Sequence, residues 1–256
     1  MGDSVREPLA YYRNNIDGLL TVCEVMRAHD CRRFVFSSSA TVYGDPPTLP
    51  IPEDSPLTAT NPYGQTKLMG EQILNDLGRA DANWQTACLR YFNPVGAHAS
   101  GLIGEDPRGT PANLMPFVAQ VAVGRRPAVS VFGNDYPTPD GTCLRDYIHV
   151  SDLADAHVLG LEHLLAGGAH QPVEPLIFNL GTGTAFSVQE VLTAAQEVTQ
   201  RPLTAVVAPR RPGDPPTLVA SAQKARQVLG WEPRYPDLRV IIAHSWAWHQ
   251  RTGPSP

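Results

Sequence analysis

The sequence contains no stretch of about 18 or more consecutive apolar residues, the length that a helix needs to span a bilayer. Cysteine is scarce, and the few cysteines lie too far apart to form the C-x-x-C pairs that bind zinc. The histidines form no ligand cluster either, because His244 and His249 are five residues apart and do not share a helix face. We therefore predict no membrane span and no metal site. The cysteines are Cys23, Cys31, Cys88 and Cys143.

A surplus of positive charge is also missing. The formal net charge is −5 at pH 7, whereas nucleic-acid-binding proteins cluster Lys and Arg on one face. We expect neither a nucleic-acid nor a membrane partner. Cysteines without a disulfide framework are typical of a reducing compartment, so we expect a cytoplasmic protein. With 256 residues, 42% hydrophobic and 18% charged, the chain has a globular composition and is long enough for two lobes.

Strand-like and helix-like segments alternate along the chain, which favours an α/β fold with a parallel sheet. Short apolar runs predict strands at Arg33–Ser39, Trp84–Tyr91 and Pro175–Leu180. Helical spacing of apolar residues predicts helices at Pro8–His29, Pro62–Gly78, Leu114–Val123, Ser151–Ala166, Ser187–Thr199, Ser221–Leu229 and Pro236–Gln250. Ser151, Ser187 and Ser221 are the predicted N-caps. A long loop is expected at Asn93–Ala112, and a shift in composition after Phe92 suggests that a second lobe begins there.

The best candidates for chemistry are Ser39, Tyr63 and Lys67. Tyr63 and Lys67 are four residues apart in a predicted helix and therefore share one of its faces. A lysine beside a phenol favours the phenolate, which would make a general base of a tyrosine whose ordinary pKa is about 10. Ser39 ends a predicted strand, and ligands of parallel sheets bind beyond the carboxyl ends of strands. Taken alone, the tyrosine–lysine pair could also be a half-exposed tyrosine beside a solvated lysine.

Longer motifs occur along the chain in a fixed order. They are SSSATVYG at Ser37–Gly44, NPYGQTK at Asn61–Lys67, LRYFNPVGAH at Leu89–His98, NLMP at Asn113–Pro116, FGNDYPTPDGTCLRDYIHV at Phe132–Val150, FNLGTGTAFSV at Phe178–Val188 and PRRPGD at Pro209–Asp214. Together they resemble the UDP-glucose 4-epimerase family of extended short-chain dehydrogenases/reductases, from about Asp3 to the last predicted helix. The resemblance implies a Rossmann-like parallel sheet with a smaller mixed α/β lobe that binds the substrate.

The glycine-rich turn of that family, G-x-x-G-x-x-G, has no counterpart before Tyr11. Because this turn cradles the cofactor pyrophosphate, the resemblance implies a sheet that is truncated on its N-terminal side. We expect residues 1–92 to form a partial NAD-binding domain, to which segments around 147–182 return, and residues 93–256 to form mainly a UDP-sugar-binding lobe. Residues 1–256 by themselves are expected to bind NAD weakly and to aggregate, since an open apolar sheet edge invites pairing.

One late glycine pattern, Gly181-Thr182-Gly183, follows the predicted strand at Pro175–Leu180. It lacks the third glycine of a dinucleotide-binding motif. We therefore predict a tight turn in the substrate-binding half, made possible by the conformational freedom of glycine, and no phosphate cradle.

The resemblance implies NAD-dependent inversion at C4 of a UDP-hexose, either UDP-glucose or UDP-galactose, through a 4-keto intermediate. It assigns the O4 proton to Tyr63, with Ser39 holding or relaying it. Lys67 would tune Tyr63 and hold the nicotinamide ribose. The implied cofactor contacts are Asn14, Ser39, Tyr63, Lys67 and Phe92. The resemblance also implies a role in galactose metabolism and a homodimer when the protein is complete.

Most of the implied substrate contacts come after Phe92. Arg145 and Arg211 match positions that face the diphosphate, for which cationic donors are suited. Asp214 matches a ligand of the ribose hydroxyls, and Phe132 a neighbour of the uracil. Leu218 falls where some members carry a tyrosine beside the sugar, so the choice between plain and N-acetylated hexoses stays open. The remaining matches are Asn93, Asn113 and Leu114.

Two alternatives stay open. A sugar-nucleotide dehydratase or decarboxylase of the same superfamily would share many of these motifs. Dehydratases carry an acidic pair just after the catalytic hydroxyl, however, and Ala40 and Thr41 at those places cannot do acid–base chemistry. The other alternative is an inactive remnant that binds a partner or nothing, which the missing glycine-rich turn favours.

Overall fold

The computed structural model describes the chain except for residues 1, 108, 112, 168–173, 212 and 253–256. The chain divides into two units, each made of separate stretches of sequence. Unit 1 comprises Met1–Phe92, Asp155–Leu180 and Ala220–Trp231, and unit 2 comprises Asn93–Ala154, Gly181–Val219 and Glu232–Pro256. How the cofactor and substrate functions divide between the units stays a prediction.

Unit 1 contains a parallel sheet with the strand order β1-β2-β6. The strands are β1 (Arg33–Ser39), β2 (Gln85–Tyr91) and β6 (Leu176–Leu180). Ser39 lies opposite Tyr91, and Tyr91 lies opposite Leu180. The three strands therefore end at one common rim, which is where parallel sheets bind their ligands. The parallel pairing confirms the predicted α/β class.

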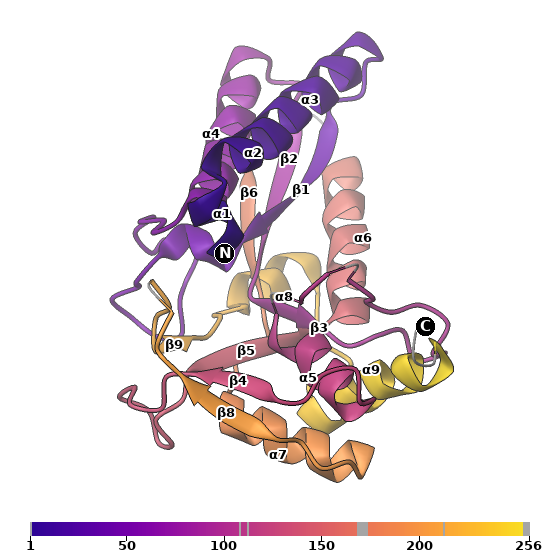
Figure 1. The fold of residues 1–256 in the computed structure, drawn as a ribbon. Coiled ribbons are helices and arrows are strands. Elements are labelled where there is room, and N and C mark those ends of the chain that lie inside the picture. The colour runs from indigo at the N-terminus through magenta and orange to yellow at the C-terminus, as the bar shows by residue number, and fades with distance from the viewer. Residues whose placement is uncertain (1, 108, 112, 168–173, 212, 253–256) are drawn as a thin grey trace. The chain divides into compact units, whose positions relative to one another are not determined.

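Helices cover both faces of this sheet (Figure 1). On one face lie α3 (Gly18–Ala28) and α4 (Pro62–Ala80), and on the other lies α6 (Val150–Ala166). Side chains alternate in direction along β1, so its even-numbered residues face α3 and α4 while its odd-numbered residues face α6. The core between α3, α4 and the sheet consists of Leu19, Cys23, Leu74, Trp84 and Cys88, with Met26, Phe34, Phe36, Ile73, Leu77 and Ile177 packed against them.

The helix predicted at Pro8–His29 is confirmed over most of its length, but it is not one regular α-helix. The structure has α1 (Gly2–Arg6), α2 (Pro8–Tyr12), a π-helical turn η1 (Arg13–Asp17) and then α3. The spacing of apolar residues predicted a helix here but not the π-helical turn within it. Within the wide turn, the Asn15 amide donates to Thr66 Oγ1 on α4 at 2.8 Å. Such π-helical turns occur frequently at functional sites.

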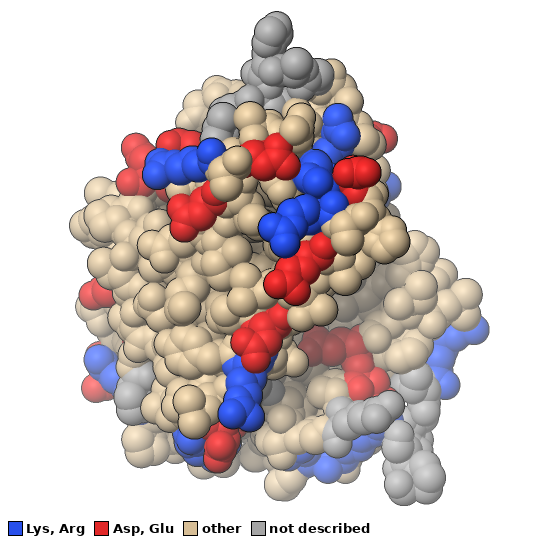
Figure 2. Space-filling view, turned by 90° about the horizontal axis from the view of Figure 1, so that it is seen from above, with Lys and Arg blue, Asp and Glu red and all other residues tan. Residues whose placement is uncertain are grey.

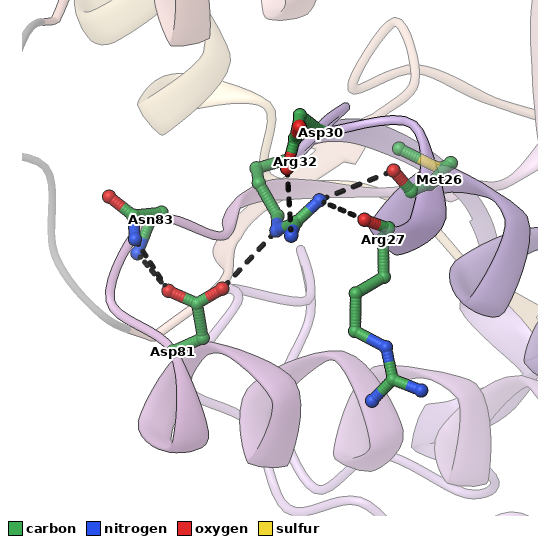
Figure 3. Close-up of polar contacts among 6 residues, drawn as sticks. All are labelled: Met26, Arg27, Asp30, Arg32, Asp81 and Asn83. Atoms are coloured by element: carbon green, nitrogen blue, oxygen red, sulfur yellow. Dashed lines mark hydrogen bonds and ion pairs between the residues drawn. The ribbon is translucent and has the colours of Figure 1, made fainter.

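Arg32 joins the ends of α3 and α4 (Figure 3). Its Nη1 donates to the carbonyl oxygens of Met26 and Arg27, at 3.2 and 3.0 Å, in the last turn of α3. Its Nε donates to Asp81, the C-cap residue of α4, at 3.2 Å. A cation at a helix C-terminus is favourable because the final carbonyls lack partners within the helix.

Only one of the predicted serine N-caps is confirmed. Ser187 caps α7 (Val188–Thr199) in a capping box with Glu190. Ser151 lies inside α6, where its N–H donates to His149 Nδ1, so the histidine ring supplies the capping acceptor. Ser221 donates its N–H to the Ile51 carbonyl, and α8 (Gln223–Leu229) begins after Ala222. In both errors another partner replaced the expected cap: the His149 ring for α6, and for Ser221 the carbonyl of Ile51, which is distant in the sequence.

Unit 2 contains a mixed sheet in which β3 (Asn93–Val95), β7 (Ala185–Ser187) and β9 (Thr217–Leu218) all pair with β5 (Leu144–His149). A separate parallel pair joins β4 (Val129–Phe132) to β8 (Ala205–Ala208). Residues of α5 (Leu114–Ala122), α7 and α9 (Leu238–Thr252) form one apolar core together with residues of β3, β4 and β5. The loop predicted at Asn93–Ala112 is thus wrong in its first residues, which form β3.

On the surface, basic and acidic side chains lie near one another among uncharged residues on the face that Figure 2 presents. In the part of the chain that the structure describes, no helix combines the length and the hydropathy of a bilayer span.

A buried ion pair ties α4 to β2 in unit 1. Arg90 on β2 donates to both carboxylate oxygens of Glu71 on α4, at 2.9 and 2.6 Å. The side chains are 3% and 7% exposed. Arg90 Nη1 also donates to Tyr43 Oη at 2.8 Å and to the Glu53 carbonyl oxygen at 3.0 Å. Because both ions have exchanged water for several charge-assisted bonds, the pair depends on every partner being present.

Removing one member of this pair should be costly. Glu71→Ala is expected to lower the free energy of unfolding by about 3–5 kcal/mol, because Arg90 would keep a buried charge without its counterion. Urea unfolding at pH 7 measures the loss. The control is Glu197→Ala, which breaks an exposed ion pair with Arg239 and should cost at most about 1 kcal/mol. Similar losses in the two variants would contradict the expectation.

A buried histidine makes the stability of unit 2 depend on pH. His149 is 0% exposed, and its Nε2 lies 3.0 Å from His244 Nδ1. Burial is the main reason that the pKa of His149 is lowered to about 4, and the nearby His244 is the second. His98 and Arg234 lower this pKa further, whereas a backbone hydrogen bond to Ala97 raises it. The unfolded chain, with a histidine pKa of about 6.5, binds more protons between these two values. Stability must therefore fall as the pH drops through this window.

Between pH 7 and pH 5, His149 is expected to remove about 2 kcal/mol of stability from unit 2. Urea unfolding followed by circular dichroism at each pH measures the change. His149→Phe cannot titrate, so its loss over the same pH interval should be smaller by about that amount. Equal losses in wild type and variant would assign the pH dependence to other groups.

Candidate active site

Ser39 lies where β1 ends and a 3-10 turn, η2 (Ala40–Tyr43), begins. Its Oγ accepts hydrogen bonds from the Thr41 backbone N–H at 3.3 Å and from Thr41 Oγ1 at 3.0 Å. The residue is 8% exposed. As the N-cap of η2, its hydroxyl is held at the rim of the sheet, in the place predicted for it.

Tyr63 lies in the first turn of α4, close to Ser39. Asn61 caps the helix through a hydrogen bond from the Gly64 N–H at 2.9 Å, and Pro62 occupies the first turn. A Cβ on Gly64 would lie 2.7 Å from the Thr41 carbonyl oxygen, so glycine allows α4 to approach η2 this closely. The Tyr63 hydroxyl is hydrogen-bonded to Ser39. The structure thus brings together two of the predicted catalytic side chains.

Lys67 lies one turn further along the same face of α4. Its Nζ donates to the Ser37 carbonyl oxygen at 2.9 Å. The ammonium lies 5.6 Å from the centre of the Tyr63 ring and 5.3 Å from that of Phe36. Burial lowers the pKa of Lys67. The predicted proximity of lysine and tyrosine is therefore observed.

The expected lowering of the Tyr63 pKa by Lys67 is wrong for the chain by itself. Burial raises the pKa of Tyr63, and the hydrogen bond from Ser39 lowers it by less. The Lys67 ammonium points to the Ser37 carbonyl instead of the phenol oxygen. A buried phenolate is penalised more by lost hydration than it gains from the nearby hydroxyl, so Tyr63 is a protonated phenol near neutral pH.

Asn14 and Lys67 line the same groove in unit 1. The groove has a volume of about 240 Å³ and also exposes Asn15, Phe34, Phe36 and Thr66. The amides of Asn14 and Asn15 and the ammonium of Lys67 can donate hydrogen bonds to the ribose of a nucleotide, and the apolar Phe34 and Phe36 can contact its ring. The described residues fit the nicotinamide-ribose part of NAD, and among them no glycine-rich turn opens a helix as the pyrophosphate cradle of a Rossmann fold does.

Phe92, the remaining predicted cofactor contact, follows β2 and is 7% exposed. Its N–H donates to the Leu180 carbonyl oxygen at 3.2 Å, which ties the ends of β2 and β6 together. The predicted contact between its ring and the cofactor stays a prediction.

The predicted substrate residues all belong to unit 2. Arg145 on β5 lies opposite Leu218 on β9, and Leu218 is 8% exposed. Asn93 on β3 pairs with Tyr147, two residues along β5 from Arg145. The pairing of β5 with β3 and β9 therefore brings these three predicted residues into one sheet. Asn113 precedes α5 without a side-chain capping bond, and Leu114 begins that helix.

Phe132 and Arg211 are in direct contact. The Arg211 guanidinium lies 3.9 Å from the centre of the Phe132 ring. The neighbouring Arg210 lies over Tyr136 at 4.1 Å, and its Nε donates to Asp135 at 2.7 Å. Asp214 closes the segment with a hydrogen bond from its N–H to the Arg211 carbonyl oxygen at 3.3 Å. Residues assigned to uracil, diphosphate and ribose are thus held next to each other by stacking and local hydrogen bonds.

The Gly181-Thr182-Gly183 segment is a tight turn, as predicted. The N–H groups of Thr182 and Gly183 donate to the carboxylate of Asp146, at 2.7 and 2.9 Å. Asp146 is 0% exposed, and Gly183 has a φ of +81°. The amides that a phosphate would need are already occupied by a protein carboxylate.

Sequence reasoning missed several neighbours of the candidate catalytic residues. The Tyr11 ring packs edge-on against Tyr63, with centroids 6.3 Å apart. Thr41 donates to Ser39, and Tyr91, whose pKa burial raises to about 12, donates to Ser37 at 2.6 Å. Glu71, four residues after Lys67, bonds to Ser38. Of these neighbours, only Glu71 could have been identified from the sequence, because its four-residue spacing from Lys67 places it on the same face of α4.

Comparison with proteins of known sequence supports the predicted family. The chain is 56% identical to UDP-glucose 4-epimerase of Bacillus subtilis (strain 168), over 97% of this chain and 71% of that protein. It is 51% identical to UDP-glucose 4-epimerase of Yersinia pestis, over 98% and 73% of the two chains. Residues 1–181 match the family model described as Epimerase, NAD dependent epimerase/dehydratase family.

Solved structures agree with the sequence relatives. UDP-glucose 4-epimerase from Stenotrophomonas maltophila with bound NAD and formylated UDP-arabinopyranose has a TM-score of 0.92 at 46% identity, over 98% of this chain and 73% of that chain. The enzyme from Bifidobacterium longum in complex with NAD+ and UDP has a TM-score of 0.91 at 48% identity, with the same coverages. These matches confirm the predicted resemblance and the Rossmann-like fold.

Proposed function

The chain belongs to the NAD dependent epimerase/dehydratase family, and from this premise we propose that it interconverts UDP-glucose and UDP-galactose by inversion at C4. The observation that carries the proposal is the cluster at the rim of the unit 1 sheet, where Tyr63 is hydrogen-bonded to Ser39 and lies beside Lys67. Relatives named UDP-glucose 4-epimerase and solved with NAD and UDP support it.

NAD, when bound, supplies the acceptor and then the donor of the C4 hydride, so that the 4-hydroxyl becomes a ketone and then an alcohol of the opposite configuration. Asn14, Ser39, Tyr63, Lys67 and Phe92 are the residues that would hold it. The groove shared by Asn14 and Lys67 supports this assignment.

The chain's own residues handle the proton. Tyr63 would accept the O4 proton as the alcohol is oxidised and return it when the ketone is reduced. Ser39, already hydrogen-bonded to Tyr63, would hold O4 in reach of the phenol. For Tyr63 to act as a base, its raised pKa must fall in the loaded enzyme. The Lys67 ammonium is the nearby charge that could contribute once it turns from Ser37 toward the phenol.

Unit 2 would bind the UDP part of the substrate. Phe132 would contact the uracil, Asp214 the ribose, and Arg145 and Arg211 the diphosphate. Asn93, Asn113 and Leu114 would complete the substrate contacts. Leu218 would lie beside the hexose, where a smaller side chain than tyrosine leaves room for an N-acetyl group. We also propose a role in galactose metabolism, in the cytoplasm, with the protein as a homodimer.

A dehydratase is the second candidate, and the structure of η2 argues against it. Dehydration requires an acid–base pair after the catalytic hydroxyl. Here Ala40 is 4% exposed, and the Thr41 hydroxyl is bonded to Ser39. Neither side chain can donate and accept a proton near neutral pH.

An activity assay distinguishes these candidates. The chain, expressed with whatever in-frame coding sequence lies upstream of Met1, is incubated with NAD and UDP-galactose, and the products are separated by chromatography. We expect UDP-glucose to form until the two epimers are in equilibrium. A 4-keto-6-deoxy sugar nucleotide would instead identify a dehydratase. No product from a folded, NAD-bound protein would contradict both candidates.

Tyr63→Phe tests the proton transfer. We expect kcat to fall by about 10²–10⁴-fold, the usual contribution of one acid–base group. The dissociation constant of UDP, measured by calorimetry, should stay within about twofold, because only one hydroxyl is lost. Tyr235→Phe is the control, because it removes one phenol hydroxyl from unit 2, and it should leave kcat unchanged. A Tyr63→Phe variant with the activity of wild type would place the base elsewhere.

A further inference from the structure

Each serine at the end of β1 is bound by a different side chain from one face of α4. The Ser37 carbonyl accepts from Lys67, the Ser38 hydroxyl donates to Glu71, and the Ser39 hydroxyl is bonded to Tyr63. Tyr63, Lys67 and Glu71 are spaced four residues apart and therefore form one stripe along α4. Two members of this stripe belong to the proposed site, and the third does not.

Glu71 is the fixed member of the stripe. It is 6% exposed, and its partner Ser38 is 1% exposed. Arg90 holds both carboxylate oxygens, and Arg90 is itself held by Tyr43. Tyr43 in turn donates to Asn179 Oδ1 on β6 at 2.7 Å. The Glu71 carboxylate is therefore anchored to all three strands of the unit 1 sheet, whereas Lys67 and Tyr63 have fewer polar partners.

We propose that Glu71 is a positioning residue for the reaction, which through Ser38 fixes the Ser37–Ser39 segment so that Ser39 lies beside Tyr63. Lys67, bonded to the Ser37 carbonyl of the same segment, reports on the position of that segment. The proposal rests on the proposed function only for its catalytic consequence. Glu71 does not contact Tyr63 or Lys67 by any hydrogen bond among the described residues; it acts on them by holding the segment to which both are bonded.

Ser38→Ala isolates this bond. The Ser38 hydroxyl is lost, but the Glu71 oxygen that accepted it still accepts from Arg90 Nε at 2.9 Å. No buried acceptor is left without a partner, so the fold should survive. The matched control is Ser55→Ala, because Ser55 is also buried in unit 1 and its hydroxyl has no hydrogen-bond partner among the residues that the structure describes. Ser38→Cys provides a third variant with a weaker donor of similar volume.

The chain has two lysines, Lys67 and Lys224, which allows a readout that does not depend on activity. Brief labelling with acetic anhydride, followed by mass spectrometry, gives a separate acetylation rate for each lysine. If the segment is released in Ser38→Ala, the bond from Lys67 to the Ser37 carbonyl weakens. Acetylation of Lys67 should then be about tenfold faster or more, because the weakened hydrogen bond is one donated by a charged ammonium. Lys224 should react at an unchanged rate in every variant.

Ser38→Cys should give an intermediate Lys67 rate, and Ser55→Ala the rate of wild type. An unchanged Lys67 rate in both Ser38 variants would overturn the proposal, and so would a Ser55→Ala rate as high as that of Ser38→Ala. Thermal melting verifies that each variant is folded. If Ser38→Ala does not fold, Ser38→Cys alone decides.

Activity gives the second readout. We expect Ser38→Ala to lower kcat by about tenfold with little change in KM for UDP-galactose, because a displaced Ser39 no longer holds O4 in reach of Tyr63, while the UDP contacts are untouched. A change confined to KM would overturn the proposal that the position of the Ser37–Ser39 segment affects the chemical step. If wild type itself forms no UDP-glucose, the proposed function fails, while the acetylation rates still decide whether Glu71 holds the segment.

Discussion

The buried pair of Arg90 and Glu71 is the constraint on which the rest of unit 1 depends. It joins α4 to β2, reaches β1 through Ser38, and reaches β6 through Tyr43 and Asn179. Apolar packing alone would tolerate small shifts of α4 along the sheet, since hydrophobic contacts have little directional preference. A bidentate ion pair tolerates no such shift, because its geometry is narrow and its failure leaves a buried charge. The pair therefore determines the alignment of the helix with the strands more than it adds to stability.

The environment of Tyr63 shows a tension between burial and function. In the proposed mechanism, water is kept from the reacting carbon, yet burial raises the pKa of the phenol that would lose its proton. The hydrogen bond to Ser39 offsets only part of this effect. Lys67 carries the compensating charge, but in this structure it is bonded to the strand. The Lys67 ammonium lies 5.6 Å from the centre of the Tyr63 ring, so the proposed mechanism requires it to leave the Ser37 carbonyl for the phenol oxygen.

Much of the fold could be predicted because the decisive forces were local. The strand at Arg33–Ser39 was predicted at its true bounds from an apolar run followed by hydroxyls, and the Ser187 N-cap from its position just before a helical pattern. Predictions failed where a distant partner decided the outcome. Asn15, within the π-helical turn at Arg13–Asp17, is bonded to Thr66 of α4, and the N–H of Ser221 is bonded to Ile51.

For the candidate site, spacing revealed the tyrosine and the lysine but not the groups that hold them. Tyr11 gives no periodic signal, and the direction of the Lys67 bond depends on a backbone carbonyl. The contact between Arg211 and Phe132 joins segments far apart in the sequence, so only the folded chain could reveal it.

The discontinuity of unit 1 has a consequence for how the protein forms in the cell. Its sheet and its last helix come from stretches that end at Phe92, Leu180 and Trp231. During synthesis, β1 and β2 emerge well before β6, and translation needs on the order of ten seconds to pass from the first stretch to the last. Throughout that interval, apolar strands lack a parallel neighbour that has not yet been made. Chaperone capture of the nascent chain would therefore matter most while the ribosome is translating unit 2.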